Sequence, residues 1–80
     1  MNSIENQVAI VISRAAMIPV EQVTPDAKLV ALGISSLDYI ECVMGVEQVF
    51  QIEIDRDDLK QFETVQDVID AVREATRVNG

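Results

Sequence analysis

Apolar residues recur at helical spacing in three stretches of this 80-residue chain, and this pattern predicts an all-α fold. In the first stretch, residues 3–16, the apolar side chains gather on one side of a helical projection while the polar ones lie outside it. The other two stretches run over residues 36–50 and from 65 to about 75. A hydroxyl side chain that can cap the first turn stands at the start of the first stretch and directly before the other two: Ser3, Ser35 and Thr64.

The segments between these helices are predicted to form loops and one short helical turn. Pro19 and Pro25 interrupt any helix over residues 17–35, so a connection of nearly twenty residues is expected there. Its apolar side chains are expected to pack it down onto the helices: Leu29, Val30, Leu32 and Ile34. Residues 51–54 are expected to be extended, and residues 57–61 to form a third, short helix. The sequence therefore predicts a single domain over residues 1–80, built as a small bundle of three long helices and one short helix.

Charge and composition exclude several classes of function. Six Lys and Arg stand against fourteen Asp and Glu with no His, a formal charge of -8, so binding to nucleic acid phosphates is excluded. One Cys and no His leave no disulfide framework, zinc site or histidine base. The acidic stretch at residues 55–58 contains Arg56 and no following Gly, unlike a calcium-binding loop, so no metal site is expected. With no basic leader and no long apolar run, we expect a cytoplasmic monomer.

The helix predicted over residues 36–50 carries two apolar stripes instead of one. The broader stripe is expected to face the core: Tyr39, Cys42, Val43, Val46, Val49 and Phe50. The side opposite is expected to face solvent: Asp38, Glu41, Gly45 and Gln48. Leu37, Ile40 and Met44 form a second stripe next to these acidic residues, which indicates a surface that docks other proteins. The alternative is that the helix touches two neighbours and buries both stripes.

The start of this helix resembles the prosthetic-group site of acyl carrier proteins. The segment Leu32-Gly33-Ile34-Ser35-Ser36-Leu37-Asp38-Tyr39-Ile40-Glu41 is similar to the family pattern Leu-Gly-x-Asp-Ser-Leu-Asp-x-x-Glu. The likeness continues at Val43-Met44, at Glu47 and over residues 50–54 and 64–67, and it covers nearly the whole chain. It implies the small four-helix bundle of that family and a carrier without catalytic activity of its own.

The resemblance also implies a cofactor, partners and site residues. A 4′-phosphopantetheine arm derived from coenzyme A would be joined to Ser36 by a phosphopantetheinyl transferase and would hold acyl groups as thioesters. Partners would be that transferase and acyl-transferring or chain-modifying enzymes with basic docking patches. Charge would be presented by Asp38, Glu41 and Glu47, and apolar contact by Leu37, Ile40 and Met44. Candidates for lining an acyl pocket are Tyr39, Val46, Ile54, Leu59 and Phe62.

The chain departs from the family pattern at several positions. Ser35 stands where the family usually has Asp, which places more of the docking charge on Asp38 and Glu41 and leaves two adjacent serines. Arg56 falls in a stretch that is usually acidic. Tyr39 and Phe62 are bulkier than the residues common at their positions and are expected to project between the helices. They can be ordinary core residues, or they can narrow the pocket so that it takes short or polar cargo.

The sequence leaves the cargo and the class of function open. A carrier in fatty acid, lipid or polyketide-type biosynthesis is expected, and an aminoacyl or peptidyl carrier is the alternative within the same family. A second class is an acidic helical interaction module that never receives the arm. The mass of the protein after exposure to coenzyme A and a transferase distinguishes these two classes.

Overall fold

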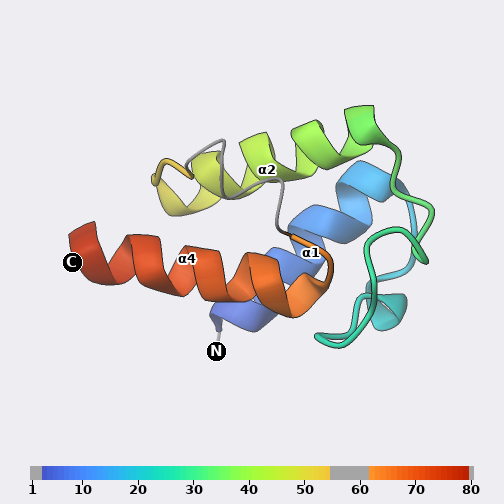
Figure 1. Cartoon of the computed structure of the whole chain (residues 1–80), viewed down its shortest axis with the longest axis horizontal. Helices are drawn as coiled ribbons and strands as arrows, with labels where there is room; N and C mark the ends of the chain where they lie inside the picture. The colour runs from blue at the N-terminus through green and yellow to red at the C-terminus, as the bar shows by residue number, and fades with distance from the viewer. Residues whose placement is uncertain (1–2, 55–61, 80) are drawn as a thin grey trace.

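Three α-helices pack around a common core in the described part of the chain. The computed structural model describes residues 3–54 and 62–79. Within these ranges the elements are α1 (Ile4–Ala16), a 3-10 turn η1 (Val20–Gln22), α2 (Ser36–Phe50) and α4 (Val65–Asn79). Figure 1 shows α2 and α4 as two layers with α1 crossing behind them. The all-α prediction is confirmed, while the short third helix expected at residues 57–61 lies outside the described residues.

Helices α1 and α2 begin where their capping residues predict. The Ser3 hydroxyl accepts a hydrogen bond from the backbone N–H of Asn6, and the Ser35 hydroxyl accepts one from the N–H of Asp38, both at 3.2 Å. Such a bond satisfies one of the N–H groups that the first turn of a helix leaves without a backbone partner. Helix α1 ends at Ala16, and the C-cap residue Met17 that follows takes the left-handed conformation with φ of 57°.

Helix α4 has a two-way cap at its start and runs longer than predicted. The Asp67 N–H donates to the Thr64 hydroxyl, while the Asp67 carboxylate accepts the N–H of Thr64 at 3.0 Å. This reciprocal pair is a capping box. The sequence predicts an end near Ala75, but the helix continues to Asn79. The pattern failed there because the last turn carries no apolar stripe, although it contains no helix breaker either.

The core is formed by the inward faces of the three helices and the segments that join them. Val8, Val46 and Val72 are fully buried. The remaining buried apolar side chains are Ile12, Val23, Leu29, Cys42, Val43, Ile52, Ile54, Val65, Val68 and Ile69. The apolar residues that recur at helical spacing in α4 all lie in this core: Val65, Val68, Ile69 and Val72. The core therefore follows from the helical pattern of the sequence, with the exceptions described next.

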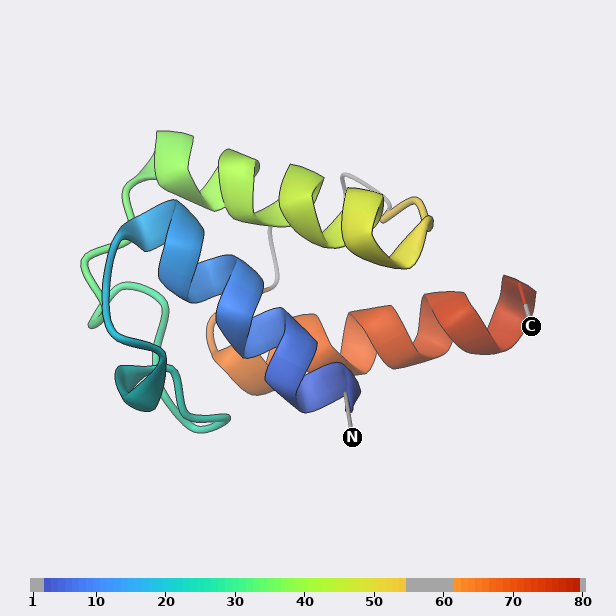
Figure 2. The same ribbon diagram turned by 180° about the vertical axis from the view of Figure 1, so that it is seen from behind.

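Two residues of α2 lie differently from the prediction because α1 crosses α2 at an angle. Figure 2 shows α1 running from the side of α4 toward the first half of α2. Gly45, predicted to face solvent, lies against α1, since a Cβ atom there would come within 3.0 Å of Val11 Cγ1. Val49, predicted to belong to the core stripe, is 54% exposed. The crossing thus brings α1 close to the middle of α2 and leaves the last turn of α2 partly uncovered.

The long connection after α1 is fastened to the start of α4. The N–H of Leu29 donates to the carbonyl of Glu63 at 2.9 Å, and the N–H of Val65 donates to the carbonyl of Ala27 at 3.0 Å. Leu29 is buried, and Leu32 and Ile34 pack against the core, as predicted. Val30 was predicted to pack as well, but it is 86% exposed. The connection is therefore an ordered part of the fold that leads the chain to the first turn of α2.

The first turn of α2 and the last turn of α4 lie at opposite ends of the molecule. Both ribbon views show this arrangement (Figures 1 and 2), in a body measuring 32 × 31 × 20 Å along its principal axes. No helix in the described part of the chain is long and apolar enough to cross a membrane.

Candidate functional site

The two adjacent serines at the start of α2 have different positions, and the capping hydrogen bond is made by Ser35. Ser35 is the N-cap, and its hydroxyl accepts the Asp38 N–H. Ser36 is the first residue of the helix, and it is exposed. The capping bond belongs to Ser35, so the Ser36 side chain can accept a bulky group without loss of that cap. The N-terminus of a helix favours an added anionic group through its N–H groups and its dipole.

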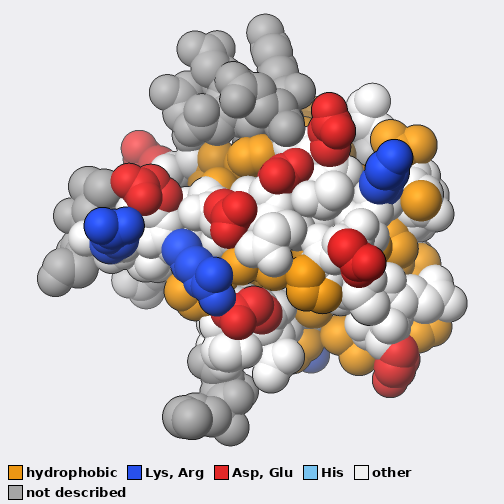
Figure 3. Space-filling model, turned by 60° about the horizontal axis from the view of Figure 1, so that its bottom comes forward, with side chains coloured by type: hydrophobic (Ala, Val, Ile, Leu, Met, Phe, Trp, Pro, Cys, Tyr) orange, Lys and Arg blue, Asp and Glu red, His pale blue; other side chains and the backbone are white. Residues whose placement is uncertain are grey.

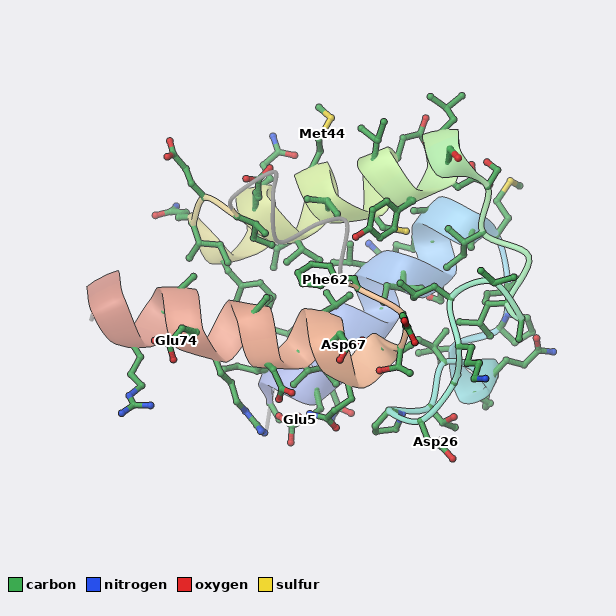
Figure 4. The ribbon with its side chains drawn as sticks, in the orientation of Figure 1. Glu5, Asp26, Met44, Phe62, Asp67 and Glu74 are labelled. Atoms are coloured by element: carbon green, nitrogen blue, oxygen red, sulfur yellow. The ribbon has the colours of Figure 1, made fainter. Side chains whose placement is uncertain are left out.

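The second apolar stripe of α2 lies on the surface. Leu37, Ile40 and Met44 are 66%, 52% and 61% exposed. Figure 4 shows Met44 pointing away from the body of the protein. The structure therefore contradicts the alternative in which α2 buries both of its stripes. The exposed stripe begins directly beside Ser36 and follows the helix for two turns.

The three predicted docking carboxylates of α2 are not equivalent. Glu41 is exposed and Asp38 is partly exposed, as a docking surface requires. The carboxylate of Glu47 is partly buried and accepts the backbone N–H of Ile54 at 2.8 Å. Glu47 was expected to present its charge to partners, and for that role an exposed side chain was assumed, but the structure places it partly inside. The Glu47 side chain binds the segment that follows α2, because the chain reverses direction after the helix and brings the N–H of Ile54 to the carboxylate.

A shallow groove lies where this returning segment passes the second half of α2. Its volume is about 650 Å³ and it is open to solvent. Its lining residues are Met44, Glu47, Gln48, Ile52, Glu53 and Ile54. Of the predicted pocket residues, Ile54 lines this groove, whereas Val46 is fully buried in the core. Gln48, Ile52 and Glu53 were not predicted to line a pocket, because helical periodicity carries no information about how a non-helical segment folds back.

Tyr39 and Phe62, each expected to project between the helices, are partly buried and contact each other. Their ring centroids lie 6.5 Å apart at an interplanar angle of 79°, an edge-to-face arrangement. Both side chains are partly buried and pack against the core. Burial, together with the nearby Asp67 carboxylate and Cys42, raises the pKa of Tyr39 to about 12. Leu59, the remaining predicted pocket residue, lies outside the described residues.

The single cysteine is unsuited to carry cargo itself. Cys42 is buried on the core side of α2. Burial raises the pKa of its thiol to about 11, with Asp38 and Glu41 contributing in the same direction. At neutral pH the thiol is therefore protonated, and the protonated form is a poor nucleophile. Any reactive thiol at this surface has to come from an added group.

Charged side chains outside α2 are distributed over the surface. On the face drawn in Figure 3, basic side chains lie among acidic ones. One ion pair joins α1 and α4, with Arg73 Nη2 2.8 Å from Glu5 Oε1, and about half of each side chain is exposed. Across residues 3–54 and 62–79, no three Cys, Asp or Glu side chains are close enough together to hold a metal ion.

Comparison with known proteins agrees with this geometry. The family described as "Phosphopantetheine attachment site" matches residues 6–72. An acyl carrier protein of Buchnera aphidicola (subsp. Schizaphis graminum, strain Sg) is 36% identical over 73 residues, which cover 90% of this chain and 92% of that protein. The chain belongs to the acyl carrier protein family. The crystal structure of an acyl carrier protein from Thermotoga maritima matches its fold with a TM-score of 0.81 at 25% identity, covering 91% of this chain and 86% of that one.

The start of α2 fits the prosthetic group of the acyl carrier family. That group, 4′-phosphopantetheine, is joined through a phosphate and supplies a terminal thiol that holds an acyl cargo as a thioester. An exposed hydroxyl at the first residue of a helix meets the needs of the phosphate, because the N–H groups and dipole of the first turn stabilise its negative charge. The first turn of α2 would hold the group, with the exposed apolar stripe beside it.

Proposed function

We propose that residues 1–80 act as one acyl carrier domain whose arm is attached at Ser36. In this role the protein holds acyl intermediates and delivers them to cytoplasmic enzymes of fatty acid, lipid or polyketide-type biosynthesis. It is a carrier and has no catalytic residue of its own. The observation that carries the proposal is that Ser35 and Ser36 are both exposed, while the capping hydrogen bond is accepted by the hydroxyl of Ser35.

The surface beside Ser36 supports docking of partner enzymes. Leu37, Ile40 and Met44 supply exposed apolar area, and Glu41 and Asp38 supply negative charge next to it. Apolar contacts provide most of the affinity of such an interface, whereas charges steer the encounter with a basic partner. A transferase or an acyl-transferring enzyme with a basic, apolar-centred patch fits this surface.

The attachment site is tested by mass measurement on matched serine variants. The wild type, Ser36→Ala and Ser35→Ala are incubated with coenzyme A and a phosphopantetheinyl transferase, and their intact masses are recorded. The wild type and Ser35→Ala should gain the mass of one arm, whereas Ser36→Ala should gain none. Ser35→Ala should lose about 1 kcal/mol of stability with its cap, and Ser36→Ala should unfold nearly like the wild type.

Two other outcomes would contradict the proposal in different ways. Modification that persists in Ser36→Ala and disappears in Ser35→Ala would move the arm to the neighbouring serine. Absence of added mass with several transferases would favour an unmodified interaction module. Identification of the acyl, aminoacyl or peptidyl group on the modified protein purified from cells decides the class of cargo.

A further inference from the structure

An aromatic pair occupies the interior next to the proposed attachment residue. Tyr39 follows Ser36 by three residues, so its side chain leaves α2 about 4.5 Å further along the helix axis, close to one turn. Phe62 approaches from the segment before α4 and points into the space between α2 and α4 (Figure 4). The two rings meet edge to face at 6.5 Å. They therefore bridge these helices near the first turn of α2.

The surroundings of the pair hold both rings in place. Tyr39 and Phe62 each pack against the buried core. The Tyr39 ring lies close enough to Asp67 to be influenced by its charge. Asp67 in turn is fixed by the backbone N–H groups of Glu63 and Thr64, at 2.8 and 3.0 Å. The aromatic pair is thus braced against the capped start of α4.

Three valines of α2 and α4 lie deeper in the core than the two rings. Val46 and Val72 are fully buried, and Val68 is 4% exposed. An apolar chain attached near Ser36 and entering between α2 and α4 would reach the two rings first and this valine cluster next. Protein interiors are packed as densely as organic crystals, so a longer chain gains depth only by displacing side chains.

The open groove on the other side of α2 is a poor alternative shelter. Met44, at its edge, lies eight residues after Ser36, about 12 Å along the helix. The groove is shallow and exposed to water, and two of its lining residues are Glu47 and Glu53. A saturated chain placed there would keep much of its surface in contact with water and would gain little from burial.

We propose that the Tyr39–Phe62 pair acts as a size filter, which makes this protein a carrier of short or polar acyl groups. The proposal rests on the carrier function proposed above. Short groups occupy the space between Ser36 and the rings, and polar groups lose little by remaining in water. Long saturated chains must either separate the two rings or stay outside, and neither arrangement stabilises the protein.

The filter is tested by loading the protein with saturated acyl groups of increasing length, from acetyl to palmitoyl. Each acyl-phosphopantetheine is transferred from its coenzyme A ester, the product is verified by intact mass, and the thermal midpoint is measured by circular dichroism. The midpoint of the wild type should rise over the first short chains and then remain constant. In Phe62→Leu and Tyr39→Leu, the rise should continue to longer chains, because each variant removes one ring of the pair.

A matched control separates the filter from a general effect of aromatic removal. Phe50 is also partly buried against the core, but it lies in the last turn of α2, far from Ser36. Phe50→Leu should lower all midpoints without changing the length at which they level off. A wild-type midpoint that rises steadily up to palmitoyl, or a levelling-off that is the same in both ring variants, would overturn the filter. Correctly loaded masses with either result would leave the carrier function standing, whereas an absence of loading would contradict both proposals.

Discussion

Helices α2 and α4 have the same length, yet they use their apolar residues differently. Helix α4 turns Val65, Val68, Ile69 and Val72 into the core, where each is less than 5% exposed. Helix α2 buries only Cys42, Val43 and Val46. It leaves four large apolar side chains on the surface: Leu37, Ile40, Met44 and Val49. A helix needed only for folding keeps one stripe, so the second stripe of α2 points to contacts outside this chain.

The first turns of the two helices also differ: that of α4 is closed by its own hydrogen bonds, whereas that of α2 has an exposed first residue. The start of α4 is closed by the reciprocal bonds between Thr64 and Asp67. The start of α2 shows the capping bond from Asp38 N–H to Ser35, and exposed Ser36 follows directly. The inward face and the cap of α4 therefore stabilise the fold, whereas the first residue and one apolar stripe of α2 are exposed and can contact other molecules.

The largest difference should appear when one apolar side chain is shortened on each helix. Ile69 is 1% exposed, and Ile69→Ala should cost about 2–5 kcal/mol of unfolding free energy, since it leaves a cavity. Met44→Ala should cost less than about 0.5 kcal/mol, as is usual at the surface. Urea denaturation measures both losses of stability. Met44→Ala should accept the arm from a transferase more slowly than Ile69→Ala does, because Met44 belongs to the exposed stripe beside Ser36. A Met44→Ala variant as destabilised as Ile69→Ala would show that the second stripe supports the fold.

A smaller difference is expected between two carboxylates on α2 itself. Glu47→Ala removes the acceptor of the Ile54 N–H and should cost about 1–3 kcal/mol, whereas Glu41→Ala should be nearly neutral. Both variants lose the same charge, so both should slow association with a basic partner at low salt. Comparing denaturation with stopped-flow binding separates the two roles. Equal stability of the two variants would mean that the Glu47 bond contributes nothing to the fold.

The smallest effect concerns the two caps and their response to pH. Backbone hydrogen bonds from Glu63 and Thr64 lower the pKa of Asp67 below its usual value of 3.8. This carboxylate therefore adds stability that is fully present above about pH 5 and is lost as the pH falls through the lowered pKa. The difference in unfolding free energy between the wild type and Asp67→Asn should shrink as the pH falls through the lowered pKa, because the protonated carboxyl group no longer adds the stability of its charged form.

The uncharged cap of α2 provides the control for this measurement. Ser35→Ala removes a hydrogen bond that involves no titrating group, so its cost of about 1 kcal/mol should stay constant over the same pH range. If the loss of unfolding free energy in Asp67→Asn were equally constant with pH, the negative charge of the carboxylate would contribute nothing to the cap of α4.

The sequence predicts the elements whose determinants are local. Ser3, Ser35 and Thr64 mark the helix starts because a cap involves residues only three positions apart. The inward face of α4 follows from its spacing. Gly45 and Val49 were misplaced because their surroundings depend on the angle at which α1 crosses α2, and no pattern within α2 contains that angle.

The candidate site divides in the same way. The family motif and the two stripes locate Ser36 and the exposed Leu37, Ile40 and Met44. The contact between Tyr39 and Phe62 was not predicted, because only the projection of each ring between the helices was expected from the sequence. The role of Glu47 was missed, since its partner Ile54 reaches it only after the chain reverses direction. Periodicity describes a helix face, but it does not describe a segment that returns across it.

The opposite placement of Ser36 and the end of α4 also matters for how the protein can be tethered. A linker joined after α4 would hold the molecule by the end remote from the first turn of α2 (Figures 1 and 2). Immobilised in this way on a sensor surface, or fused to a larger protein, the carrier would present its exposed stripe outward. The molecule could then swing on its linker and meet several enzymes in turn without releasing its anchor.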